Sequence, residues 1–209
     1  MKLSIVDVGE YQACCYIVKD EENGKSFIVD PGFFCYELEK AIKTIGIDKF
    51  DYILLTHGHM DHICGASYIK EKYSGKIVIS EKEAFLLKEY RFVARVPEYE
   101  KAFRPCEADI VLTNENSIPF GDKEISVLYT PGHTPGSVCY IFENLLFSGD
   151  LLFKNSIGNY SFEGGNIFHL LHSLKTVKNL AVDYTVLPGH GTKTTIFEEK
   201  SNNPYLRNL

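Results

Sequence analysis

The chain has 209 residues, of which 44% are hydrophobic, and its formal net charge at pH 7 is -6. This length and apolar content suffice for one sizeable core, so we expect a single domain over residues 1–209. The mild, scattered charge argues against nucleic acid or an anionic membrane surface as a partner, and no apolar stretch is long enough to span a bilayer. Asp7 comes too early for the apolar region of a signal peptide, which predicts a cytoplasmic protein.

The N-terminal segment predicts strands followed by a helix. We expect strands at residues 3–8, 13–19 and 25–29, the last two separated by a turn rich in Asp, Glu, Asn and Gly. Apolar residues at helical spacing then predict a helix from Tyr36 to Ile45, which ends at a glycine.

The densest chemical signal follows a predicted strand at residues 51–55. Residues 56–62 read Thr-His-Gly-His-Met-Asp-His and hold three histidines and a carboxylate. Histidines at this spacing do not share one helical face, so we expect a loop that turns them toward one point. Imidazole nitrogens with one carboxylate suit Zn²⁺ or Fe²⁺ rather than Ca²⁺ or Mg²⁺, which prefer oxygen. The predicted transition-metal ligands of this loop are His57, His59, Asp61 and His62.

The middle of the chain is less regular. A helix should begin soon after the histidine loop, and a strand should follow at residues 76–79. Ser80 with Glu83 three residues later forms a capping-box pattern and predicts a helix through about Lys88. Residues 90–108 break this rhythm, and two interpretations stay open. We favour a surface connection between half-domains; the alternative is a cap over the active site that contacts substrate.

The C-terminal half repeats the placement of a ligand at the end of an apolar strand. Each candidate lies beside a glycine, where the backbone turns sharply and comes close to an ion. These candidates are His133, Asp150 and His190. The expected elements are strands at 124–130, 137–142, 145–148 and 184–187 and a helix over roughly 166–179. Each half thus contains strands and a helix, which predicts two similar α/β halves packed sheet on sheet with helices outside.

The His-x-His-x-Asp-His motif and the three later ligands together resemble the metallo-β-lactamase fold superfamily, in particular its hydrolytic branch. The resemblance runs from the first strand through the last loop. It implies an α/β fold of the αββα four-layer sandwich type with two zinc ions, iron or manganese being alternatives. It also implies that Asp30 supports the metal loop from behind. The implied ligands are His57, His59 and His133 for one ion, Asp61, His62 and His190 for the other, and Asp150 as the bridge.

Within that superfamily the chain is similar to short, single-domain glyoxalase II-like hydrolases, at residues 156–158, 164–165, 188–195 and 203–206. This likeness implies that a metal-bridging hydroxide cleaves a small anionic acyl thioester, with Asp61 and Asp150 in the catalytic centre. Two departures bear on glutathione recognition. The chain stops where full-length glyoxalase II adds a helical domain, and Asn159 stands where those enzymes usually carry Arg or Lys. The candidate substrate contacts are Asn159, Tyr160 and Phe162.

Other reactions of the same fold stay open. A persulfide dioxygenase with a mononuclear iron keeps the same motif and is the main alternative, and a lactonase is a second. A β-lactam substrate is disfavoured, because true β-lactamases of this fold usually have a cysteine where Asp150 stands. The sequence does not indicate an oligomeric state.

Overall fold

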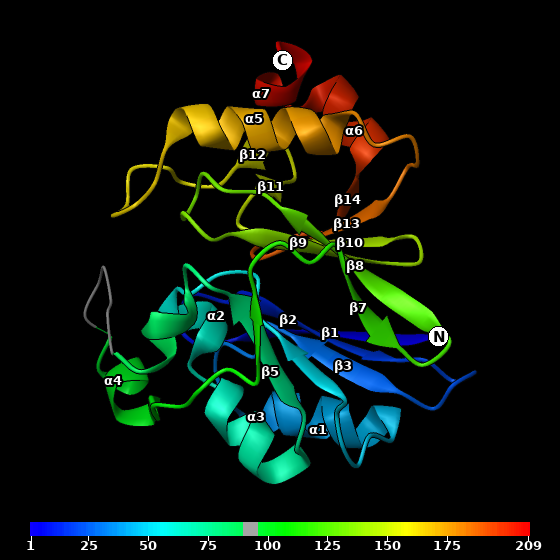
Figure 1. The fold of residues 1–209 in the computed structure, drawn as a ribbon, viewed down its shortest axis with the longest axis vertical. Coiled ribbons are helices and arrows are strands. Elements are labelled where there is room, and N and C mark those ends of the chain that lie inside the picture. Colours follow the sequence, from blue (N-terminus) through cyan, green and yellow to red (C-terminus); the bar gives the residue numbers. More distant parts are fainter. Residues whose placement is uncertain (90–95) are drawn as a thin grey trace. The chain divides into compact units, whose positions relative to one another are not determined.

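The computed structural model describes residues 1–89 and 96–209, and two six-stranded sheets organise the described chain (Figure 1). The chain divides into two compact units. The first holds residues 1–113 and 120–122, and the second holds residues 114–119 and 123–209. Two sheets with flanking helices confirm the expected α/β fold class. Within the described residues, no helix is long and apolar enough to cross a membrane.

In the first unit, six strands lie across one sheet in chain order. The first three pair antiparallel, and the third to the sixth run parallel. Because these four strands run in the same direction, their carboxyl ends lie at the same edge of the sheet. The strands are β1 (Lys2–Val8), β2 (Ala13–Lys19), β3 (Ser26–Val29), β4 (Tyr52–Leu54), β5 (Lys76–Ser80) and β6 (Ile110–Leu112). The helices are α1 (Tyr36–Ile45), α2 (Met60–Ile63), α3 (Ala66–Tyr73), the 3₁₀ helix η1 (Ala84–Leu87) and α4 (Pro97–Ala102).

Helices α1 and α3 cover one face of this sheet (Figure 1). Leu38 and Ile42 of α1 are fully buried in the same apolar cluster as Ile69 of α3 and Ile53 of β4. The helix α1 ends at Gly46, whose φ of 77° is left-handed and therefore favours glycine. Both bounds of α1 agree with the sequence prediction.

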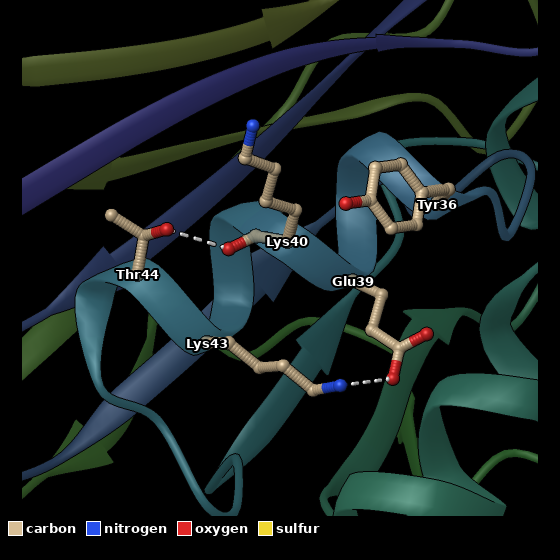
Figure 2. A pocket seen from close by; sticks show the side chains of 5 residues that line it. All are labelled: Tyr36, Glu39, Lys40, Lys43 and Thr44. Carbon is tan, nitrogen blue, oxygen red and sulfur yellow. Dashed lines mark hydrogen bonds and ion pairs between the residues drawn. The ribbon is translucent and has the colours of Figure 1, made fainter.

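The outer face of α1 is polar. Side chains there line a surface pocket of about 330 Å³ (Figure 2). Glu39 pairs with Lys43 at 2.7 Å and with Lys72 at 2.8 Å, and these partners lower the pKa of Glu39 to about 2. Solvent screens such exposed pairs, so they add little to stability. The pocket is lined by Tyr36, Glu39, Lys40, Lys43 and Thr44.

The second sheet has the strand order β14-β13-β10-β9-β8-β7. Its strands β10 and β13 are parallel, and a helix connects them. The strands are β7 (Ser117–Phe120), β8 (Lys123–Tyr129), β9 (Val138–Phe142), β10 (Leu145–Gly149), β13 (Thr185–Pro188) and β14 (Thr194–Thr195), with a separate ribbon of β11 (Leu152–Phe153) and β12 (Ser156–Ile157). The helices are α5 (Ile167–Lys178), α6 (Ile196–Asn202) and α7 (Pro204–Arg207).

Helix α5 lies on one face of the second sheet (Figure 1). Asn166 caps its start, because the Asn166 side chain accepts a hydrogen bond from the His169 N–H at 3.1 Å. Leu170 and Leu174 of α5 are fully buried in a cluster with Leu146 of β10. This packing holds the helix against the sheet whose strands β10 and β13 end just before Asp150 and His190.

Two predictions in the first unit were wrong in detail. The segment 56–62 was expected to be a loop throughout, but α2 begins at Met60, because the N–H groups of His62 and Ile63 both donate to the His59 carbonyl. The capping box after β5 is also absent from the described turn. Its helix is only the short η1, and the Glu83 side chain accepts a hydrogen bond from Gly58 instead.

Several short elements were not predicted. They are β6, β7, β11, β12, β14, α4, α6 and α7. Strands of two to four residues are too short for alternation to show, and tertiary pairing decides them. In the segment 90–108, residues 90–95 lie outside the described residues, while Pro97–Ala102 forms α4.

Substitutions on α5 test this packing. Leu170→Ala should lower the free energy of unfolding by about 2–5 kcal/mol, because it leaves a cavity in the second core. Phe168→Ala on the same helix should change it by less than about 0.5 kcal/mol, since that side chain is 78% exposed. Urea unfolding of both variants measures the difference. Equal losses would show that α5 is not packed as described.

Candidate metal centre

The ends of three adjacent parallel strands converge on the histidine loop. Asp30 follows β3, the loop itself follows β4, and Glu83 lies three residues past the end of β5. The Leu55 N–H donates to the Val78 carbonyl at 2.9 Å, so the start of the loop still pairs with β5. The sheet thus brings a buried carboxylate to each side of the loop.

Asp30 binds the loop at three points. Its Oδ1 accepts the Thr56 N–H at 2.8 Å, and its Oδ2 accepts the Thr56 hydroxyl at 2.6 Å. The same Oδ2 lies 3.0 Å from Nδ1 of His62. A carboxylate only accepts, so this Nδ1 carries the proton. In the neutral ring, the lone pair of His62 is then on Nε2, the state that a metal ligand needs.

The orientation of His57 follows from the same contacts. Because the Thr56 hydroxyl donates to Asp30, its oxygen is left to accept from Nδ1 of His57, 3.0 Å away. The lone pair of His57 is therefore on Nε2, which lies 3.1 Å from Nδ1 of His59. Two nitrogens bound to one tetrahedral zinc at about 2.0–2.1 Å lie roughly 3.3 Å apart. This pair of rings therefore fits a single ion.

Asp61 and His62 come from the first turn of α2. Nε2 of His62 lies 3.6 Å from Oδ2 of Asp61. The loop after β3 packs closely here, since a Cβ on Gly32 would come within 1.5 Å of the Asp61 carbonyl oxygen. Only glycine permits this approach, so Gly32 sets the position of the α2 start.

In the second unit, Asp150 and His190 lie after two parallel neighbours, β10 and β13. The Gly189 N–H donates to the Gly149 carbonyl at 2.8 Å and joins the two strand ends. Nε2 of His190 then lies 3.8 Å from Oδ2 of Asp150, and Nε2 of His133 lies 3.4 Å from the same oxygen. One carboxylate oxygen thus lies between two imidazoles.

His133 has a defined orientation. Its Nδ1 lies 2.6 Å from the Asn159 carbonyl, which can only accept, so the lone pair is on Nε2. In the neutral ring, that lone pair faces a carboxylate oxygen of Asp150, 3.4 Å away. Two electron-pair donors that face each other in this way are what a cation between them requires. Imidazole and carboxylate donors therefore converge in the second unit as well.

The structure places the predicted site residues in two groups. The first unit brings together Asp30, His57, His59, Asp61 and His62, and the second brings together His133, Asp150 and His190. Each group contains imidazole and carboxylate donors, the set that transition metals prefer.

The candidate substrate residues differ in their surroundings. The Asn159 side chain accepts the Ser161 N–H at 2.8 Å, so it closes a local turn. The Phe162 ring lies edge-on to His133, with 6.1 Å between centroids, and Tyr160 is 41% exposed. Sequence reasoning missed Phe153, whose ring is 6.2 Å from that of His190. Its only sequence signal was an apolar run.

Replacing Asp30 tests the support of the loop. In Asp30→Asn, an amide NH₂ replaces one of the two acceptor oxygens. It then faces either the Thr56 N–H or the Thr56 hydroxyl and Nδ1 of His62, so two donors face each other where a hydrogen bond was. We expect metal affinity to fall about 10- to 100-fold, measured by competition with a chelator. Asp122→Asn, at an exposed turn, is the control. Unchanged affinity in Asp30→Asn would contradict this role.

Known proteins are similar to this chain over nearly its whole length. A family model described as the metallo-beta-lactamase superfamily matches residues 8–190. The chain is 31% identical to hydroxyacylglutathione hydrolase GloC of Haemophilus influenzae, covering 99% of this chain and 98% of that one. Its fold is similar to that of BLEG-1 B3 metallo-beta-lactamase (TM-score 0.88, 34% identity, 98% and 99% coverage) and of TTHA1623 in a di-iron-bound form (0.78, 29%, 97% and 100%). The chain therefore belongs to the metallo-β-lactamase superfamily and has its fold.

Proposed function

We propose that this protein is a dinuclear metallohydrolase that cleaves small anionic acyl thioesters. The observation that carries the proposal is the fixed orientation of His57, His62 and His133, each of which presents a lone pair on Nε2. Such presentation suits metal binding, because a metal ligand uses the lone pair of a neutral imidazole nitrogen. The similarity to GloC, a hydroxyacylglutathione hydrolase, supports the choice of a thioester.

We assign the ligands as the family pattern implies. His57, His59 and His133 would hold one ion, and Asp61, His62 and His190 the other. Asp150 would bridge them, because its Oδ2 already faces two imidazoles. We expect zinc first, while the di-iron form of TTHA1623 supports iron as an alternative. Ions bound there supply an activated water and polarise a carbonyl group.

The residues of the chain determine which substrate suits the site. Two divalent ions held with Asp61 and Asp150 would leave a net positive charge at the site, which would attract an anionic substrate. A thiol leaving group has a pKa of about 8.5 and departs without a separate acid. An amine would need one. A thioester therefore needs no proton donor in the site, whereas a peptide or a β-lactam needs one for its amine leaving group.

Metal analysis combined with a substrate panel tests the proposed function. Protein purified without added metal should contain about two transition-metal ions per chain and should hydrolyse S-lactoylglutathione. Chelation should abolish turnover, and zinc should restore it. One iron per chain, with oxygen consumed when a persulfide is added, would instead identify a dioxygenase. Hydrolysis of a lactone or a cephalosporin without thioesterase activity would also overturn the proposal.

Asn159 predicts how glutathione thioesters bind. Its amide lacks the charge that Arg or Lys would offer to a glutathione carboxylate, and such a charge-assisted hydrogen bond is worth about 1.5–3 kcal/mol. We therefore expect weak saturation by S-lactoylglutathione and a KM about 10- to 100-fold lower in Asn159→Arg. The orientation of His133 should survive, since it depends on the backbone carbonyl of residue 159.

Asn202→Arg adds the same charge on an exposed position of α6 and serves as the control. Steady-state kinetics of the two variants separate a local contact from a general charge effect. An unchanged KM in Asn159→Arg would show that another cation binds the carboxylate.

A further inference from the structure

A second buried carboxylate contacts the histidine loop. Glu83 is only 1% exposed, although it lies in a short polar turn after β5. Its Oε2 accepts the N–H of Gly58 at 3.0 Å. Gly58 lies between His57 and His59, so this hydrogen bond is to the peptide that links two predicted metal ligands.

The packing around this hydrogen bond is tight. A Cβ added to Gly58 would lie 2.3 Å from Cδ1 of Leu86 and 2.8 Å from Oε2 of Glu83. The turn itself is ordered by backbone hydrogen bonds from Glu83 to Ser80 and from Leu86 to Glu83, both at 2.9 Å. The backbone at Gly58 therefore packs directly against the side chains of Glu83 and Leu86.

Glu83 and Asp30 act on opposite sides of the same histidine. Asp30, after β3, holds the N–H of Thr56, and Glu83, after β5, holds the N–H of Gly58. These N–H groups belong to the residues immediately before and after His57. The two strands that flank β4 thus each contribute one carboxylate, and together they fix the backbone on both sides of the ring.

We infer that Glu83 is a positioning residue for the metal loop, which acts through the Gly58 N–H and sets the separation of the His57 and His59 nitrogens. This inference rests on the proposed metal centre. Without the acceptor, a buried N–H loses its partner, and the loop gains conformations in which the two nitrogens no longer face one ion. Metal affinity should then fall more than the stability of the metal-free protein does.

Three variants test the inference. Glu83→Ala removes the acceptor, Glu83→Gln keeps an amide oxygen of the same reach, and Glu81→Ala removes an exposed glutamate from the same turn. Zinc affinity is measured by competition with a chelator, and thermal unfolding of the metal-free protein is measured in parallel. We expect Glu83→Ala to weaken zinc binding by about 10-fold or more. Glu83→Gln should stay within about threefold of the wild type, and Glu81→Ala should match it.

The outcomes separate the inference from the proposed function. A wild type that binds no zinc would contradict the metal centre itself. If the wild type binds zinc and Glu83→Ala binds it equally well, only the role of Glu83 is overturned. Loss of affinity in Glu83→Gln equal to that in Glu83→Ala would also overturn it, since the hydrogen bond would then not be the cause. If metal-free Glu83→Ala is unfolded, Glu83→Asp, one methylene shorter, replaces it with the same expectation of weakened binding.

Discussion

The contact between Asp30 and the histidine loop is the constraint on which the first half of the centre depends. One buried carboxylate accepts from the backbone and hydroxyl of Thr56 and lies beside Nδ1 of His62. Through Thr56 it also determines which nitrogen of His57 carries the proton. Because Asp30 only accepts hydrogen bonds, the protons of His57 and His62 are on Nδ1, and in the neutral rings the lone pairs are on Nε2. Its φ of 48°, unusual for a residue other than glycine, shows that the turn after β3 is shaped to bring this carboxylate into place.

The parallel strand ends explain how such a centre is assembled. In each unit, neighbouring parallel strands end at one edge of a sheet, so residues far apart in sequence meet without long side chains: Asp30 beside Thr56, and Asp150 beside His190. The rings are held differently in the two units. The first unit uses a carboxylate and a hydroxyl, whereas the second uses the main-chain carbonyl of Asn159 to hold His133. Both devices place an acceptor at Nδ1, so that in the neutral ring the lone pair is on Nε2.

The sequence predicted those parts of the fold and the site that depend on local pattern. Helix α1 was predicted to the residue, because apolar residues at helical spacing and a terminal glycine define it locally. The candidate ligands were singled out because three histidines and a carboxylate lie within six residues of one another and the later candidates follow apolar strands beside glycines. Glu83 was misread, since Ser-x-x-Glu is also a capping box, and only the tertiary position of Gly58 shows which partner it takes. The early start of α2 was missed for the same reason: it depends on His59 and on the close approach of Gly32, and spacing alone shows neither.

The backbone and the side chain of Asn159 have separate contacts, which bears on how the proposed centre could keep its ligands while its substrate changes. Its carbonyl orients His133, and any residue can supply a carbonyl. Its side chain is exposed and, among the described residues, hydrogen-bonds to Ser161 in a local turn, so its replacement should not disturb that orientation. A substitution at this position therefore alters the charge offered near the site and leaves the ligand geometry intact. The chain is similar, at nearly equal identity, to proteins named for different reactions, a hydroxyacylglutathione hydrolase and a B3 metallo-beta-lactamase. Under the proposed function, this separation would account for that. In the proposed function, groups at the strand ends and in the backbone support the ligands, and side chains of the loop that follows Asp150 would determine specificity.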